Sequence, residues 1–336
     1  METNFYSQHL SLQQLRNQPE TKHNNYLHID VPAYPRPVLH VTHVSHSTDL
    51  DGFRRIMVYT GFKSPGYRRD EPKVVWFSLT PSRAELREAE GRSVTIVHPN
   101  GTEERFEPVR RLQHDQGEAA EAPGPEDGFL QTFATSPVFL SSSRLGSFCF
   151  TLPLQDVLDN YSRQFCRGEK PVMRVWKTVL YKQKVMYAVL VHSPDNQDEF
   201  SDFPLLQGEE TSICAFREEP EPHFIWRPQA MSETHEFELQ VNPENHSLSA
   251  EPCPSHDEAD RRIRLSYYVW DEVSLALHVG HEDLRFKNQE LQKSVRFCEM
   301  GNPPRPISVF QTFEEAQSQV PWPLQRYSES EVAINP

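Results

Sequence analysis

Short runs of alternating or wholly apolar residues, separated by polar segments, are the feature that most constrains the fold of this chain. Such runs have the length of β-strands and recur along most of the sequence. They occupy 38–44, 74–79, 148–152, 172–181, 185–192, 223–231, 235–241, 262–270 and 273–279. Helical spacing is rarer and is found after Asp49 and over 82–90, 154–166 and 282–297. The sequence therefore predicts an α+β fold of mixed or antiparallel β-sheets with a few short helices.

Two local signals predict where elements begin, end and turn. Asp49 stands where the N-cap of a helix is expected, and Gly61 stands where that helix is expected to end. The segment 93–109 reads as a hairpin, because its Asn100-Gly101 pair suits a type I′ turn.

The composition changes along the chain and predicts its organisation. Residues 1–30 are polar and rich in Gln and Asn, so we expect a flexible N-terminal arm. Residues 31–280 are expected to form a single α+β domain. Within it, residues 113–128 lose all apolar periodicity, which predicts a disordered insertion. Residues 281–336 are expected to supply a C-terminal helix and a proline-rich tail.

The proportions of proline, glycine and charge exclude some classes of function. The chain has 28 prolines against 13 glycines, and neither GxGxxG nor GxxxxGK[ST] occurs. A glycine-rich loop for phosphate binding is therefore excluded. The net charge of −14 disfavours a sequence-independent hold on nucleic acid, since that needs a basic face. Nucleic acid is an unlikely partner, although a local basic groove is still compatible with this composition.

Cysteine usage and hydropathy predict the compartment. Five widely spaced cysteines form no CxxC pair, which is typical of reduced, buried thiols. The first twenty residues contain no apolar core of the kind found in a secretion signal. The longest fully apolar run, Val185 to Val191, is shorter than the roughly 20 residues that span a bilayer. We expect a soluble protein of the cytoplasm or the nucleus, with no membrane partner.

The densest group of ionisable side chains is His40, His43 and His46 in LHVTHVSH. On a strand, His40 and Thr42 share one face while His43 points to the other, so the histidines cannot converge on one ion without a bend. We therefore expect no metal. Two other interpretations stay open: histidines that bond backbone or solvent at a strand end, and a polar pair of His40 and Thr42 at the mouth of a cleft.

The order of motifs in LHVTHVSHSTDLDGFRRIMVYTGF, residues 39–62, resembles the opening segment of ADP-ribosyltransferase-like folds. In those families, a strand His-x-Thr is followed by an amphipathic helix and Gly-Phe. The resemblance implies NAD as the cofactor, with His40 bonding the nicotinamide-side ribose and Thr42 assisting it. A second strand of the family supplies Tyr or Ser, for which Ser78 and Thr80 are candidates.

Other elements of the family pattern match less well. Thr135 and Ser136 are further candidates for the second strand. The family's glutamate, which stabilises the cationic ribose, has no clear match, and Glu236 and Glu238 are unanchored alternatives. The resemblance then implies an ADP-ribosyl or pentosyl transferase only if such a glutamate exists.

Basic residues flank the predicted helix after Asp49. Arg54 and Arg68, each followed by a second arginine, could hold a pyrophosphate near His40, or could form a charged helix face. Both interpretations stay open, and we take Arg54 and Arg68 as the candidate phosphate contacts.

The strings TSPVFLSSSRLGSF, PVMRVWKTVLYKQ and LVHSPDNQDEF also resemble a poorly characterised group of vertebrate proteins, found mainly in fish. That resemblance implies no activity. It leaves a second hypothesis, a non-catalytic intracellular protein-interaction module that serves innate defence. Its docking element would be the acidic segment 195–221 or the tail 299–336.

Overall fold

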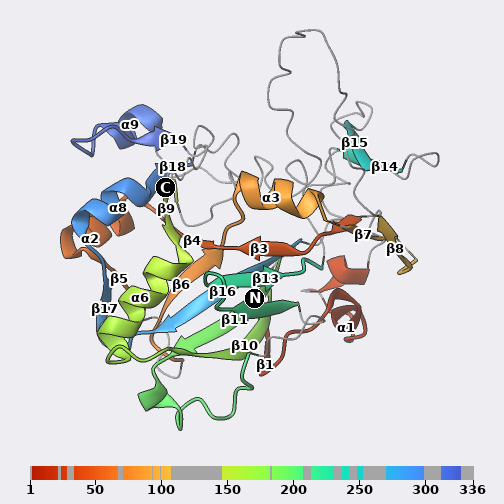
Figure 1. The fold of residues 1–336 in the computed structure, drawn as a ribbon, viewed down its shortest axis with the longest axis horizontal. Coiled ribbons are helices and arrows are strands. Elements are labelled where there is room, and N and C mark those ends of the chain that lie inside the picture. The colour runs from red at the N-terminus through yellow and green to blue at the C-terminus, as the bar shows by residue number, and fades with distance from the viewer. Residues whose placement is uncertain are drawn as a thin grey trace.

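The computed structural model has an α+β fold in which strands dominate (Figure 1). It describes residues 2–21, 24–28, 34–66, 71–92, 94–98, 100–106, 146–181, 184–206, 213–229, 237–241, 248–252, 270–298 and 312–326. The predicted insertion at 113–128 lies outside these residues, so it stays a prediction. The fold class predicted from the strand-like runs is confirmed.

The strands are β1 (Thr3–Tyr6), β2 (Tyr34–Arg36), β3 (Leu39–Val41), β4 (His43–Thr48), β5 (Gly61–Lys63), β6 (Val74–Leu79), β7 (Val94–Val97), β8 (Glu103–Phe106), β9 (Phe148–Pro153), β10 (Val172–Tyr181), β11 (Lys184–His192), β12 (Cys214–Arg217), β13 (His223–Trp226), β14 (Phe237–Val241), β15 (Leu248–Pro252), β16 (Trp270–His278), β17 (Asp283–Arg285), β18 (Val295–Phe297) and β19 (Gln325–Arg326). The helices are α1 (Leu12–Arg16), α2 (Leu50–Tyr59), α3 (Arg83–Glu90), α6 (Leu154–Phe165), α8 (Asn288–Ser294) and α9 (Phe313–Gln317), with 3₁₀ turns η1 (Asn25–His28) and η2 (Pro194–Asn196).

A nine-stranded sheet organises the molecule, with the strand order β1-β10-β11-β16-β6-β4-β9-β18-β19. Its neighbours are antiparallel except for β11 with β16 and β18 with β19, which run parallel. A smaller sheet of order β12-β13-β3 lies in front of the large sheet in Figure 1. The sheets are therefore mixed and antiparallel, as predicted.

One face of the large sheet is apolar and packs against the smaller sheet. Val44, Phe77 and Leu275 point to this face, and they belong to the same core cluster as Val41 and Phe224 of the smaller sheet. Alternate residues of a strand point to opposite faces, so the face of β4, β6 and β16 that carries these residues is part of the core. This face holds the two sheets together through apolar burial.

The opposite face of the same strands carries a row of hydroxyl groups next to a second apolar cluster that includes Val74, Trp76 and Ala276. Ser274, Ser78, Ser45 and Thr151 lie directly opposite one another on β16, β6, β4 and β9. We call these four residues the hydroxyl rung. The Thr80 hydroxyl hydrogen-bonds Ser45 Oγ at 2.7 Å, which extends the polar surface by one step along β6.

The N-terminal segment is part of the fold. β1 pairs with β10 at one edge of the large sheet, and Ser11 caps α1. Leu10, Leu12, Leu15 and Leu27 are buried. The prediction of a flexible arm over 1–30 is therefore wrong for the described residues, because a few leucines anchor an otherwise polar segment.

The single helix predicted over 282–297 is also wrong. The segment forms β17, α8 and β18 in succession, and only α8 is helical. Leu284 pairs with Phe62 of β5, while Val295 and Phe297 pair with β9. Tertiary strand pairing overrides the local helical spacing at both ends. Because β18 belongs to the large sheet, the predicted division at residue 280 does not separate two structural units.

Three local predictions need correction. The C-cap of α2 is Thr60, in the left-handed conformation, and Gly61 begins β5. A Cβ at Gly61 would lie 2.8 Å from the Leu284 carbonyl oxygen, so close strand packing requires this glycine. The predicted hairpin exists as β7 and β8, but only Gly101 has a positive φ, which excludes a type I′ turn. The segment 242–260, predicted to be a loop, contains β15, which pairs with β14.

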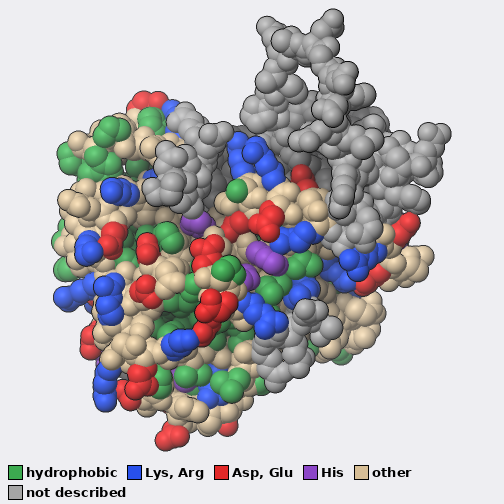
Figure 2. All heavy atoms as spheres, in the orientation of Figure 1, with side chains coloured by type: hydrophobic (Ala, Val, Ile, Leu, Met, Phe, Trp, Pro, Cys, Tyr) green, Lys and Arg blue, Asp and Glu red, His purple; other side chains and the backbone are tan. Residues whose placement is uncertain are grey.

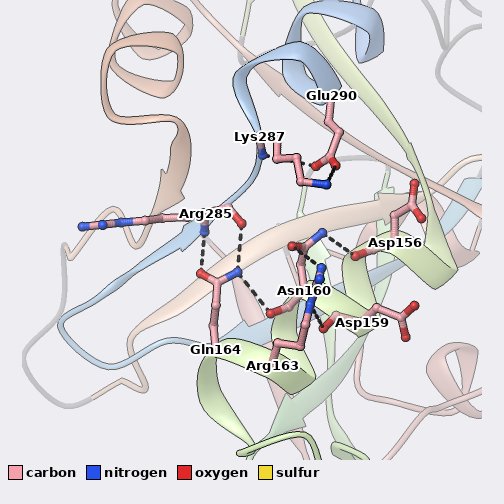
Figure 3. A network of polar contacts seen from close by, with 8 residues as sticks. All are labelled: Asp156, Asp159, Asn160, Arg163, Gln164, Arg285, Lys287 and Glu290. Atoms are coloured by element: carbon pink, nitrogen blue, oxygen red, sulfur yellow. Dashed lines mark hydrogen bonds and ion pairs between the residues drawn. The ribbon is translucent and has the colours of Figure 1, made fainter.

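A polar network joins α6 to the segment that follows β16 (Figure 3). The Gln164 side-chain amide donates to the Arg285 carbonyl at 2.8 Å and accepts from the Arg285 N–H at 2.9 Å. Near the start of α6, burial raises the pKa of Asp156, and the carboxylates of Glu290 and Asp159 raise it further. The network fixes α6 and makes its N-terminal end locally acidic.

Candidate functional site

The segment that carries the predicted residues His40 and Thr42 passes from one sheet to the other. β3 pairs with β13 in the smaller sheet, with His40 opposite Ile225, while β4 pairs with β6 and β9 in the large sheet. Thr42 lies between the two strands, and its carbonyl accepts from Leu154 N at 2.7 Å. The chain therefore changes from one sheet to the other at Thr42.

A buried carboxylate from α3 closes this junction. Glu85 Oε1 accepts hydrogen bonds from both the backbone N–H and the hydroxyl of Thr42, each at 2.7 Å. Glu85 Oε2 accepts from Ser82 N at 2.5 Å, and the Ser82 hydroxyl accepts from Glu85 N. The same side chain completes the capping box of α3 and fixes the helix to the β3–β4 junction.

The hydrogen bonds determine which nitrogen of His43 carries the proton. His43 Nδ1 lies 3.0 Å from Thr42 Oγ1. A threonine hydroxyl has one proton, and Thr42 gives it to Glu85, so Thr42 Oγ1 accepts from His43 Nδ1–H. Burial lowers the pKa of His43, although Glu85 is the strongest of the carboxylates that oppose this effect. The ring is neutral at neutral pH, and its Nε2 is a proton acceptor.

The tautomer of His40 is the opposite. Arg92 Nη1 lies 3.2 Å from His40 Nδ1, and a guanidinium group only donates, so His40 Nδ1 accepts. The proton of the neutral ring then lies on Nε2. Burial lowers the pKa of His40, and the positive charge of Arg92 lowers it further. His40 therefore offers an Nε2–H donor at neutral pH.

A second ring lies against His40. The ring centroids of His40 and His223 are 5.2 Å apart. His223 Nδ1 lies 2.8 Å from the Glu221 carbonyl oxygen, which can only accept, so His223 Nδ1 carries a proton. In a neutral ring, His223 Nε2 is then an acceptor. His40 and His223 together form the pair that we call the histidine pair, with one donor and one acceptor.

Cationic groups surround the histidine pair. Arg92 bonds Glu88 at 2.9 Å and the Val38 carbonyl at 3.3 Å, which holds its guanidinium beside His40. The charge of Arg227 also acts on His40. Figure 2 shows histidine side chains at the surface between acidic and basic side chains, over the region of β3 and β13 in Figure 1. The surface over this region is therefore mixed in charge, and His223 of the pair is 9% exposed.

The structure brings some of the predicted site residues together. Thr80 N donates to the His43 carbonyl at 3.0 Å, and Ser78 belongs to the hydroxyl rung beside it. Arg54 lies on α2, at the left of the view in Figure 1, whereas β3 lies near the centre, and Arg54 bonds Gln319 at 2.6 Å. Its described contacts lie away from His40.

The remaining candidates are not placed. Arg68, Thr135, Ser136 and Glu236 lie outside the described residues. Glu238 is on β14, whose described partner is β15.

A second His-x-Thr string, His46-Ser47-Thr48, stands directly before α2. His46 Nδ1 donates to the Trp76 carbonyl at 2.7 Å, and its ring packs against Phe62 and Phe77. Burial lowers the pKa of His46. This histidine belongs to the apolar face and is used in packing.

Sequence reasoning missed Glu85, Arg92 and His223. The Ser82-x-x-Glu85 spacing is a capping-box signal, but nothing in it shows that the carboxylate also binds Thr42. Arg92 and His223 reach His40 from 52 and 183 residues away in the chain (92 − 40 and 223 − 40), without a motif. Only tertiary structure could reveal them.

No protein-family model, curated protein or solved structure matches the chain. Within the described residues, no helix has the length and apolar character needed to cross a membrane. The same residues hold no group of three or more His, Cys, Asp or Glu side chains placed to bind a metal ion. The function has to be inferred from the geometry of the β3–β4 junction.

Proposed function

We propose that this chain has an ADP-ribosyltransferase-like fold and binds an ADP-ribose-type ligand such as NAD at the histidine pair. The opposite tautomers of His40 and His223 carry this proposal. Each hydroxyl of a ribose can donate and accept, so a neighbouring donor and acceptor complement the two hydroxyls of a ribose diol. Two rings with the same tautomer would lack this match.

The charges around the pair suit the rest of such a ligand. Arg92 touches His40, and Arg227 is close enough for its charge to lower the pKa of His40. Both guanidinium groups stay charged at any physiological pH and attract phosphate oxygens. The pyrophosphate of an ADP-ribose-type ligand would therefore lie toward these arginines, replacing Arg54 and Arg68 as the candidate phosphate contacts.

The motif order also supports the proposal. A His-x-Thr strand, the helix α2 and Gly61-Phe62 follow one another in the order of the resemblance, although the strand β4 of the large sheet stands where the resemblance has a short spacer. One role changes. The Thr42 hydroxyl gives its proton to Glu85, so Thr42 positions the junction and leaves ribose contact to His40.

Transfer activity is not part of the proposal. Glu85 is the carboxylate nearest Thr42, but it lies on a helix and is bonded to Thr42 and Ser82. A carboxylate that stabilises a cationic ribose has to face the ligand. The described residues therefore support binding more strongly than chemistry.

Ligand titration with point variants tests the proposal. We expect NAD and ADP-ribose to raise the melting temperature of the wild type, and His40→Ala and His223→Ala to remove most of that gain. Arg54→Ala is the matched control and should keep it, because its contacts are with Gln319 and Asp51. A 2′,3′-dideoxyribose analogue should bind weakly. A folded wild type that is not stabilised at millimolar NAD or ADP-ribose would contradict the proposal.

The alternative, a non-catalytic protein-interaction module, rests on a different region. Leu205, within the acidic segment 195–221, is 54% exposed, and Tyr6 of the edge strand β1 is 49% exposed. The Ser7 hydroxyl donates to the Asp202 carbonyl, so the two segments are neighbours. If this region docks a protein, Leu205→Asp should weaken complex formation. His40→Ala should leave complex formation unchanged.

A further inference from the structure

Cys149 lies on the polar face of the large sheet, beyond the hydroxyl rung. It is on β9, directly opposite Ser47 of β4, and is 4% exposed. Thr151 shares its face two residues along β9, and Ser45 lies diagonally across on β4. Three hydroxyl side chains therefore surround one buried sulfur atom.

These hydroxyls and a second thiol converge on the sulfur of Cys149. Thr151 Oγ1 lies 3.9 Å from Cys149 Sγ. Hydrogen bonding from Cys298, above all, and also from Ser47, Thr151 and Ser45 lowers the pKa of Cys149 to about 7, against the opposing effect of burial. The sheet thus forms a cradle of donors for a thiolate.

Other buried cysteines of the same chain show what burial does without such donors. Burial raises the pKa of Cys166 to about 11, even with a hydrogen bond from Ser193. Burial raises the pKa of Cys214 further still. Low exposure is common to all of them, so burial does not distinguish Cys149; its several hydrogen-bond donors do, whereas Cys166 has one donor and the nearby carboxylates of Asp195 and Glu169.

Cys298 is the neighbouring thiol. It follows β18 directly, and its N–H donates to the Ser147 carbonyl at 2.8 Å, which continues the β9–β18 ladder by one residue. Arg296 is opposite Cys149, so Cys298, two residues later, points to the same side of the sheet. Its hydrogen bond with Cys149 and its burial raise the pKa of Cys298. The two cysteines are therefore hydrogen-bonding neighbours, and Cys149 is the more acidic of the two.

We propose that Cys149 and Cys298 are an oxidisable thiol pair, in which Cys149 reacts with a hydroperoxide and Cys298 resolves the product to a disulfide. The proposal rests on the strand register and the hydroxyl cradle, and it is independent of ligand binding at the histidine pair.

The chemistry balances with hydrogen peroxide as the oxidant. The Cys149 thiolate attacks one peroxide oxygen, the O–O bond breaks, and the leaving hydroxide takes up a proton to become water. Cys149 is then a sulfenic acid. The Cys298 sulfur attacks the Cys149 sulfur, the S–O bond breaks, and a second water leaves with the thiol proton. Peroxide is reduced, and the two cysteines together lose two electrons.

Forming the disulfide requires a small movement of β18. Diagonal neighbours on antiparallel strands have Cα atoms about 7–8 Å apart, whereas disulfides bridge roughly 4.4–6.8 Å. β18 has three residues, and Cys298 stands at its end, where few backbone bonds restrain it. Oxidation would draw this end toward β9. The cradle also admits only small oxidants, because both sulfurs are nearly buried.

The test treats the reduced, full-length protein with hydrogen peroxide. Remaining thiols are then alkylated in denaturant, and the peptides are identified by mass spectrometry. We expect a peptide pair linked through Cys149 and Cys298, formed with a pH midpoint near the pKa of Cys149, about 7. Ser47→Ala should slow the reaction at neutral pH roughly fivefold, because loss of one donor to a thiolate raises its pKa by about one unit.

Variants separate the two roles. Cys298→Ser should stop at a Cys149 sulfenic acid, which dimedone traps, and Cys149→Ser should leave Cys298 unreactive. Cys166→Ser is the matched control and should form the linked peptides at the wild-type rate. The proposal is overturned if Cys149 of the folded wild type oxidises no faster than Cys166. It is also overturned if Cys149 reaches sulfinic acid without a disulfide while Cys298 is present.

Discussion

The two faces of the nine-stranded sheet are built from the same strands and carry opposite chemistry. On β6, Phe77 points into the core, while its neighbour Ser78 points to the hydroxyl rung. On β9, Phe150 is buried on the apolar face, and Cys149 and Thr151 point to the other. Strand alternation thus places the main core on one face and the hydroxyl and thiol groups on the other, where Val74, Trp76 and Ala276 belong to a second, smaller apolar cluster.

The difference between the two faces indicates which one contributes most to stability and which one carries reactive groups. Removing apolar volume from a packed face leaves a cavity, whereas polar groups on the opposite face satisfy one another by hydrogen bonds. Of the two candidate sites, the thiol pair lies on the polar side, whereas the histidine pair lies on the smaller sheet. His43 precedes Ser45 on that face of β4, and Cys149 follows at the far end of the same surface.

The largest expected effect breaks the apolar face. Phe77 is 1% exposed, and its ring contacts Phe62 and His46. Phe77→Ala should lower the free energy of unfolding by about 3–5 kcal/mol, because it removes a buried aromatic ring. Urea denaturation measures this. A loss below about 1 kcal/mol would mean that the two faces do not differ as described.

The next effect concerns the junction between the sheets. Thr42→Val removes the hydroxyl that joins His43 to Glu85. We expect a loss of about 1–3 kcal/mol, since a buried carboxylate and His43 Nδ1–H each lose a partner. Thr42→Ser keeps the hydroxyl and should restore most of the stability. Nitrogen NMR of the His43 ring should show the Nδ1–H tautomer in the wild type and its loss in Thr42→Val.

A pH titration compares the surroundings of two histidines. His9 Nε2 donates to the Ala188 carbonyl at 3.1 Å, its ring packs on Tyr187 of the core, and burial lowers its pKa to about 4. The unfolded chain binds a proton at this residue below about pH 6.5 and the folded chain does not, so stability falls as the pH falls. At about pH 5, this one group should cost about 2 kcal/mol.

His9→Gln keeps a donor for Ala188 and should recover most of that loss at about pH 5. His43→Gln should recover less, because Glu85, Glu221 and Asp156 counteract the lowering of the His43 pKa by burial. Urea midpoints between about pH 5 and pH 7.5 measure both variants. If His9→Gln and His43→Gln recover the same stability, the carboxylates around His43 have no effect, and the prediction is wrong.

The smallest expected effect sharpens the comparison on one strand. Ser78→Ala removes one hydroxyl of the rung and no core volume, so the free energy of unfolding should change by less than about 0.5 kcal/mol. Measured beside Phe77→Ala, it compares the two faces at adjacent positions. A loss as large as that of Phe77→Ala would show that the hydroxyl rung is a structural core of its own.

Much of the fold could be predicted from local patterns. The strand at 74–79 matches β6, and Asp49 caps α2 with a 2.7 Å bond to Gly52 N. The predictions failed where distant pairing decides the outcome. Residues 3–6 are a strand because β10 accepts them at the sheet edge, and residues 295–297 are a strand because β9 lies beside them. Neither pairing can be predicted from the spacing of residues within the segment itself.

The candidate site could be predicted only in part. His40 and Thr42 were identifiable from their spacing, but the groups that set their protonation were not. Glu85 was visible as part of a helix, and its second role depends on the approach of α3 to β3. The lowered pKa of Cys149 could not be predicted for the same reason, since the groups that hydrogen-bond its sulfur come from β4, β9 and the end of β18.

The position of β16 has a consequence for synthesis. It is the strand that joins β11 to β6, so the blocks β1-β10-β11 and β6-β4-β9-β18-β19 have no other connection within the large sheet. On the ribosome, β4, β6 and β9 emerge more than 100 residues before β16 and have to wait for it. The edge of β6 that faces β16 is unpaired for that time, which exposes nascent chains to misassembly. A chain that stops before residue 270 would contain β1-β10-β11 and β6-β4-β9 and lack the strand that makes them one sheet.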